Sequence, residues 1–173
     1  MARDILKTLT TEHQTVRALF EEMNATTDRA KKTRASLLER IETSLLSHAK
    51  WEEQVFYPEF KKRADRDGLQ THAEAVEEHR AVEQTVMPDV HAADVETPEF
   101  AGRVKVFAEM VDHHAKEEEK TMFKMARELF STEERARLDE EYEAWKHSGA
   151  AASVMADAKA KTGLKGAATA PIR

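Results

Sequence analysis

The side chains with the greatest capacity for chemistry in this sequence are histidines and glutamates placed four residues apart. His48 precedes Glu52 by four positions, and His114 precedes Glu118 by the same interval. Because four residues turn an α-helix by about 400°, both members of each pair project from one face, one turn apart. Imidazole nitrogens and carboxylate oxygens gathered in this way are suited to bind a metal ion.

Both pairs belong to an internal repeat with an offset of 66 residues. The segments HAKWEEQVFY and HAKEEEKTMF, which begin at His48 and His114, are identical at five of ten positions. EHQTV around His13 corresponds to EHRAV around His79, and 35 residues separate the two histidines in each copy. The repeat predicts two helical hairpins about an approximate two-fold axis, each bringing two histidines and one glutamate to the middle.

The elements that must position these residues are helices, because apolar residues recur at alternating steps of three and four. We expect helices over residues 4–24, 29–62 and 71–93, a fourth that begins at Thr97, and a short fifth that begins at Ser131. Pro98 suits the first turn of the fourth helix, and Ser131 with Glu134 forms a capping box.

The predicted fold class is all-α, an antiparallel up-down four-helix bundle with a short fifth C-terminal helix. The bundle and the fifth helix are expected over residues 1–147. Residues 148–173 are rich in Ala, Gly and Lys, and we expect them to form a flexible tail.

Composition excludes several classes of function. The chain of 173 residues contains no cysteine, which rules out thiolate zinc sites, iron–sulfur clusters and cysteine nucleophiles. Its formal net charge is −6, and it has no basic stripe with interleaved aromatic residues, which speaks against nucleic acid as a partner. Neither a signal peptide nor a run of about 18 apolar residues is present, so we expect a cytoplasmic protein without a membrane partner.

The histidines and glutamates of the repeat fall on the apolar faces of the expected helices, so they point into the core. Burying an imidazole without partners is costly and burying an unpaired carboxylate is more so, whereas a typical domain has only about 5–15 kcal/mol of stability. One interpretation is a metal-free polar layer in which imidazolium and carboxylate groups pair. The other is a metal site, which the duplication of the whole set favours.

The number and type of ligands indicate which metal such a site would hold. Four imidazoles and two carboxylates exceed the ligands of one tetrahedral zinc ion. Bridging carboxylates with terminal imidazoles suit two iron ions about 3.5–4 Å apart. The residues therefore predict a two-iron site, with manganese or a mixed pair as the alternative.

At these residues the chain resembles the hemerythrin-like, or HHE cation-binding, family. The family pattern is a lone histidine, an HxxxE pair, a histidine on the third helix and a second HxxxE pair, and here it extends over about residues 3–146. The resemblance implies an oxo- or hydroxo-bridged diiron centre in a four-helix bundle. It also implies how the ligands divide, with His13 and His48 on one iron, His79 and His114 on the other, and Glu52 and Glu118 as bridges.

One position departs from the pattern of oxygen-carrying hemerythrins, whose third helix carries a second histidine four residues after the first. This chain has Glu83 there. We expect Glu83 to be a seventh metal ligand; the alternative is that it accepts a hydrogen bond from a ligand imidazole. An anionic ligand would stabilise the ferric state and favour redox turnover over reversible oxygen carriage.

The resemblance implies a non-haem diiron protein that reacts with small oxidants, namely hydrogen peroxide, dioxygen or nitric oxide. Its specific form would be a catalase-like activity in defence against oxidative stress. The alternative is an oxygen- or iron-binding or sensing module without turnover.

Overall fold

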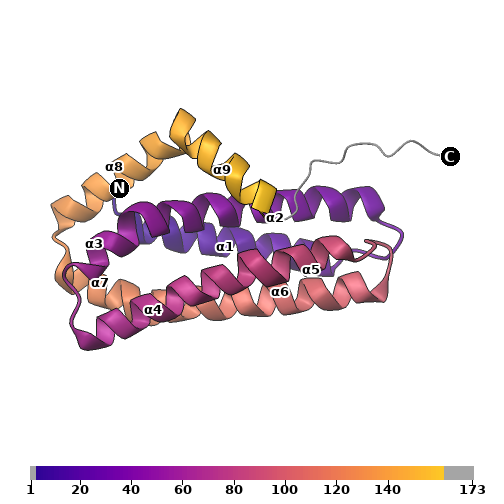
Figure 1. Ribbon diagram of the computed structural model, residues 1–173, viewed down its shortest axis with the longest axis horizontal. Coiled ribbons are helices and arrows are strands. Elements are labelled where there is room, and N and C mark those ends of the chain that lie inside the picture. Colours follow the sequence, from indigo (N-terminus) through magenta and orange to yellow (C-terminus); the bar gives the residue numbers. More distant parts are fainter. Residues whose placement is uncertain (1–2, 162–173) are drawn as a thin grey trace.

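The computed structural model describes residues 3–161, and every regular element in that range is a helix (Figure 1). The all-helical prediction is therefore confirmed. None of the described helices is long and apolar enough to cross a membrane.

Four long helices make up most of the molecule. The first is α1 (Ile5–Asn24). Each of the other three is continuous but contains one π-helical segment. The second long helix consists of α2 (Lys31–Trp51), η1 (Glu52–Phe56) and α3 (Tyr57–Lys61), and the third of α4 (Arg66–Ala81), η2 (Val82–Val86) and α5 (Met87–Ala92). The fourth consists of α6 (Pro98–Glu117), η3 (Glu118–Met122) and α7 (Phe123–Leu129). The four long helices lie side by side along the long axis, and the chain reverses direction at each short link (Figure 1).

The third long helix begins at Arg66, five residues before the expected start. The Asp65 side chain caps it by accepting a hydrogen bond from the Gly68 backbone N–H at 3.0 Å. A Cβ at Gly68 would lie 2.8 Å from the Ala64 Cβ, so the tight link between α3 and α4 needs glycine at this position.

The apolar core is divided into two clusters with the polar residues of the repeat between them. On α1, Leu9 belongs to one cluster and Val16 to the other, and His13 lies between them. On the fourth long helix, Val111 and Met122 belong to different clusters and flank His114 and Glu118 in the same way. The sequence thus places one polar layer in the middle of a core that is otherwise apolar.

Two of the π-helical segments begin at the glutamates of the HxxxE pairs. η1 begins at Glu52 and η3 begins at Glu118, the same offset of 66 residues that relates the two copies. A π-helical turn adds one residue to the helix and shifts the register of the side chains that follow, and such turns are frequent at functional sites. The duplication therefore extends to the local backbone geometry at both glutamates.

Within the described residues, two further helices follow the four long ones. Ser131 and Glu134 form the predicted capping box at the start of α8 (Thr132–Lys146), which packs against α1 and α2. α9 (Gly149–Lys161) contacts α2, η2 and α8.

The expectation of a flexible tail from residue 148 is wrong for Gly149–Lys161, and residues 162–173 lie outside the described range. Alanine has the highest helix propensity, and the Ser148 hydroxyl accepts a hydrogen bond from the Ala151 backbone N–H at 3.1 Å. Ala158 is buried in one of the two apolar clusters and Met155 packs against it. Tertiary contact therefore stabilises a helix in a segment whose composition alone is ambiguous.

Candidate metal centre

Each of the four long helices contributes one histidine to the polar layer. These site histidines, His13, His48, His79 and His114, are all buried, with relative exposures of 5–8%. Glu52 and Glu118 are buried beside them with exposures of 0% and 2%. The structure thus brings together the six residues of the repeat, as the sequence predicted.

The site histidines form two close pairs. The Nε2 atoms of His13 and His48 are 3.0 Å apart, and those of His79 and His114 are also 3.0 Å apart. The pairing agrees with the division of ligands that the family resemblance implied.

Each buried carboxylate contacts one imidazole from each pair. Glu52 Oε1 is 3.2 Å from His48 Nε2, and Glu52 Oε2 is 3.6 Å from His79 Nε2. Glu118 Oε2 is 3.4 Å from His13 Nε2 and 3.6 Å from His114 Nε2. Both glutamates therefore lie between the two halves, the position that a bridging carboxylate requires.

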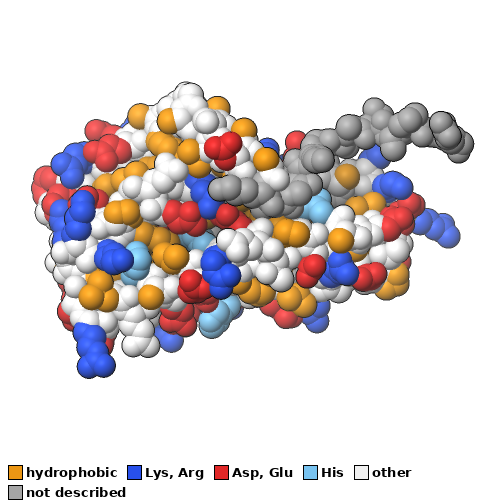
Figure 2. Space-filling model, viewed as in Figure 1, with side chains coloured by type: hydrophobic (Ala, Val, Ile, Leu, Met, Phe, Trp, Pro, Cys, Tyr) orange, Lys and Arg blue, Asp and Glu red, His pale blue; other side chains and the backbone are white. Residues whose placement is uncertain are grey.

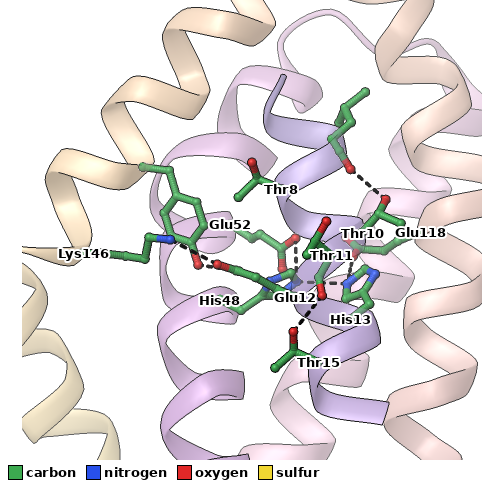
Figure 3. A network of polar contacts seen from close by, with 12 residues as sticks. Thr8, Thr10, Thr11, Glu12, His13, Thr15, His48, Glu52, Glu118 and Lys146 are labelled. Atoms are coloured by element: carbon green, nitrogen blue, oxygen red, sulfur yellow. Dashed lines mark hydrogen bonds and ion pairs between the residues drawn. The ribbon is translucent and has the colours of Figure 1, made fainter. Parts of the chain in front are cut away.

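Four further glutamates surround the site histidines, and each of them contacts the Nδ1 atom of one histidine. These outer glutamates contact Nδ1 at 2.7–3.1 Å, in the pairs Glu12–His48, Glu78–His114, Glu53–His79 and Glu119–His13. Figure 3 shows the first of these, Glu12 against His48, beside His13 and Glu118.

The sequence prediction did not include the outer glutamates, although the repeat contained their signal. Glu12 and Glu78 each directly precede a site histidine, whereas Glu53 and Glu119 each directly follow a buried glutamate. Both pairs are related by the offset of 66 residues.

The outer glutamates determine which ring nitrogen carries the proton. A carboxylate at Nδ1 favours the tautomer with N–H at that position, so in a neutral imidazole Nε2 keeps its lone pair. Two such lone pairs would then face each other at 3.0 Å within each histidine pair. Both Glu52 oxygens and Glu118 Oε2 are buried, and none of them has a hydrogen-bond partner among residues 3–161. These converging acceptors fit a metal cation, which would satisfy all of them.

Protons are the alternative to a metal ion at the ring nitrogens of the site histidines. Burial lowers the pKa of His48, but the charges and hydrogen bonds of Glu52 and Glu12 outweigh burial and raise it well above its ordinary value. Burial lowers the pKa of His114 too, but Glu118 and Glu78 outweigh burial and raise it. Metal and protons therefore compete for these nitrogens, as is usual for histidine sites.

Tyr57 breaks the symmetry at one bridging position. Its hydroxyl donates to Glu118 Oε1 at 2.8 Å and lies 3.4 Å from His79 Nε2. The corresponding residue in the other copy is Phe123, whose ring stacks on that of His13 with centroids 5.9 Å apart. Burial and the charges of Glu118 and Glu52 raise the pKa of Tyr57 well above its ordinary value, so it remains a phenol donor.

Glu83 does not lie among the metal-binding atoms. Two groups of described residues have ligand atoms close enough to share an ion, and they are His13, His48 and Glu118, and Glu52, His79 and His114. The Glu83 carboxylate is instead 2.5 Å from the Lys50 Nζ atom, which also contacts Glu53 at 2.8 Å. In this structure Glu83 therefore forms an ion pair with Lys50, whose long side chain reaches it from the neighbouring helix, and its ligation of a metal ion stays a prediction.

A small cavity adjoins the four imidazoles. Its volume is about 40 Å³, and its remaining walls include the apolar residues Leu45, Leu46, Val82 and Val111. A cavity needs roughly 10–15 Å³ to hold one water molecule, so this one has room for a small molecule.

Residues 4–126, which contain all of the site residues, match the model of the hemerythrin HHE cation binding domain. The chain belongs to this family. It is similar to a solved hemerythrin HHE cation binding domain-containing protein from Mycobacterium kansasii, with a TM-score of 0.74, 20% identity and coverage of 95% of each chain. At that identity the likeness shows a shared fold.

A relative named DNA nickase, from Nostoc sp. (strain PCC 7120), is 30% identical over 136 residues. The match covers 78% of this chain and 37% of that protein. The hemerythrin-family chain therefore spans little more than a third of this relative.

Proposed function

We propose that the chain is a diiron protein that holds two iron ions within an up-down four-helix bundle and reacts with small oxidants. The observation that carries the proposal is the pair of facing Nε2 contacts, 3.0 Å in each half, with buried carboxylates between them. His13 and His48 would hold one ion, and His79 and His114 the other. Glu52 and Glu118 would contact both.

Two iron ions would supply a two-electron redox couple, which is the chemistry that decomposition of peroxide requires. The protein's own residues orient the imidazoles through the outer glutamates and exclude bulk water through the two apolar clusters. Tyr57 keeps its proton and donates it in a hydrogen bond to Glu118, which fixes that carboxylate. Together these contacts give the centre a defined geometry.

The cavity supports a small oxidant as the partner. Its volume of about 40 Å³ accommodates hydrogen peroxide, dioxygen or nitric oxide, whereas a bulky organic hydroperoxide would not fit without displacement of wall residues. We therefore propose a catalase-like reaction in which two molecules of hydrogen peroxide yield two of water and one of dioxygen. The physiological role would be defence against oxidative stress in the cytoplasm.

Nucleic acid does not form part of this proposal, although the Nostoc relative is named DNA nickase. The net charge of −6 disfavours contact with a phosphate backbone. On the face shown in Figure 2, acidic and basic side chains are interspersed rather than gathered by sign.

The test is dioxygen evolution from hydrogen peroxide by iron-loaded protein, measured with an oxygen electrode. His114→Ala should abolish activity above that of free iron, whereas the exposed His147→Ala should retain it. Equal activity in His114→Ala and wild type would contradict the proposal. Iron binding without any turnover would favour the sensing alternative.

A further inference from the structure

Helix α8 contacts the candidate metal centre through Glu12, one of the outer glutamates. Tyr142 on α8 donates its hydroxyl to Glu12 Oε2 at 2.7 Å, and the Nζ atom of Lys146, one turn later, lies 3.3 Å from Glu12 Oε1. Glu12 Oε2 in turn accepts from His48 Nδ1 at 2.9 Å. Figure 3 shows Lys146, Glu12 and His48 in this order, from α8 toward the polar layer.

The two side chains on α8 are themselves held in place. The Tyr142 ring is 1% exposed and packs on the ring of Trp51, with centroids 4.6 Å apart. The Lys146 ammonium lies over the Tyr142 ring at 4.5 Å. Because Trp51 directly precedes Glu52, α8 contacts the segment that carries one bridging glutamate as well as the glutamate that holds His48.

This connection breaks the symmetry of the repeat. Glu78 is the counterpart of Glu12, but its contacts are with His114 at 2.7 Å and with the exposed His113 at 3.6 Å, both on α6. Among the described residues, no helix stands in the same relation to Glu78 as α8 does to Glu12. The two outer glutamates therefore have different supports, with two donors from α8 at Glu12 and contacts from α6 at Glu78.

We propose that Tyr142 and Lys146 are positioning residues for the His13–His48 half of the metal centre, so that the two iron positions differ in how tightly they hold metal. This proposal rests on the proposed function, because it takes the bound metal ions to be iron. The physical reason is that Glu12 is 28% exposed, so without its two donors the carboxylate can rotate toward water and release the His48 ring.

The first test uses the metal-free protein and needs neither iron nor activity. Tyr142→Phe keeps the ring against Trp51 and removes only the hydroxyl, so folding should be preserved. In ¹⁵N spectra of the histidine rings, Tyr142→Phe and Lys146→Met should change the His48 signals, with faster exchange of the Nδ1 proton, and should leave those of His114 unchanged. The control Lys120→Met removes an exposed lysine on η3 and should change neither ring.

The second test follows the release of iron to a chelator from the loaded protein. Wild type should release its two irons in two phases, and Tyr142→Phe should accelerate one phase about tenfold, the lower end of the usual effect of an outer hydrogen-bond partner. The other phase should keep its rate. Equal changes at His48 and His114, no change at either, or a single release phase in wild type would overturn the proposal. A selective change at His48 in a protein that takes up no iron would contradict the proposed function alone.

Discussion

Glu12 and Glu78, which are 66 residues apart, hold His48 and His114 by the same ring nitrogen, at 2.9 and 2.7 Å. Glu53 and Glu119 repeat this relationship at His79 and His13. The duplicated unit is therefore larger than three metal ligands. It includes the carboxylates that fix the tautomer and orientation of every imidazole.

Removal of the charge from an outer glutamate should weaken metal binding without removing a ligand. Glu78→Gln should lower iron affinity about 10- to 100-fold, the usual effect of an outer hydrogen-bond partner. Competition with a chelator measures it. Glu22→Gln, an exposed change on α1, is the control and should leave affinity unaltered. Unchanged affinity in Glu78→Gln would show that this outer glutamate has no role in metal binding.

The stability of the metal-free protein should fall as the pH rises. Nearby carboxylates raise the pKa of His48 and His114 above the unfolded value of about 6.5, despite burial. Their contribution to stability is therefore complete below that value and is lost as the pH rises through the folded-state pKa. Iron affinity should change in the opposite direction, because the metal requires unprotonated Nε2.

Thermal unfolding of metal-free and iron-loaded protein from about pH 6 to about pH 9 checks this prediction. The difference in melting temperature between the two forms should widen with pH. A constant or narrowing difference would contradict the competition between protons and metal.

Glu83 should act through Lys50 and not through metal. Glu83→Gln should therefore leave the number of bound metal ions unchanged, because it disrupts only the ion pair with Lys50. Glu52→Gln should weaken or abolish binding at both positions, since its carboxylate contacts His48 and His79. Metal analysis of both variants distinguishes the roles; loss of one ion in Glu83→Gln would restore the original expectation of ligation.

Filling the cavity should slow the reaction while metal stays bound. Val111→Phe places a larger side chain in a cavity of about 40 Å³ and should reduce peroxide turnover at full iron content. Overpacking of this kind costs about 1–3 kcal/mol of stability. Leu38→Phe is the matched control, in the same apolar cluster but away from the cavity walls. Equal turnover in the two variants would show that the cavity is not on the substrate's path.

The six residues of the repeat could be predicted because spacing within a helix and a fixed offset between copies are both visible in a sequence. The contact between His13 and Glu119 joins residues 106 positions apart, and it depends on which helices are neighbours. Even so, all four outer glutamates adjoin a metal-site residue in the sequence. Glu12 and Glu78 precede a site histidine, and Glu53 and Glu119 follow a buried glutamate.

Two other features depend on tertiary contacts. Glu83 pairs with a lysine on the neighbouring helix, a contact that its position in the sequence does not indicate. The tail prediction was wrong over Gly149–Lys161 because a segment rich in alanine becomes a helix when Met155 and Ala158 pack against the core. Neither contact has a local signature, since each depends on how helices that are distant in sequence pack together.

The four long helices are proposed to hold a pair of metal ions between two histidine pairs. Anaerobic titration of the metal-free protein with ferrous iron, followed by absorption and by metal analysis after desalting, measures this stoichiometry. We predict saturation at two irons per chain, one for each histidine pair. Saturation at one ion per chain, or no binding at all, would contradict it.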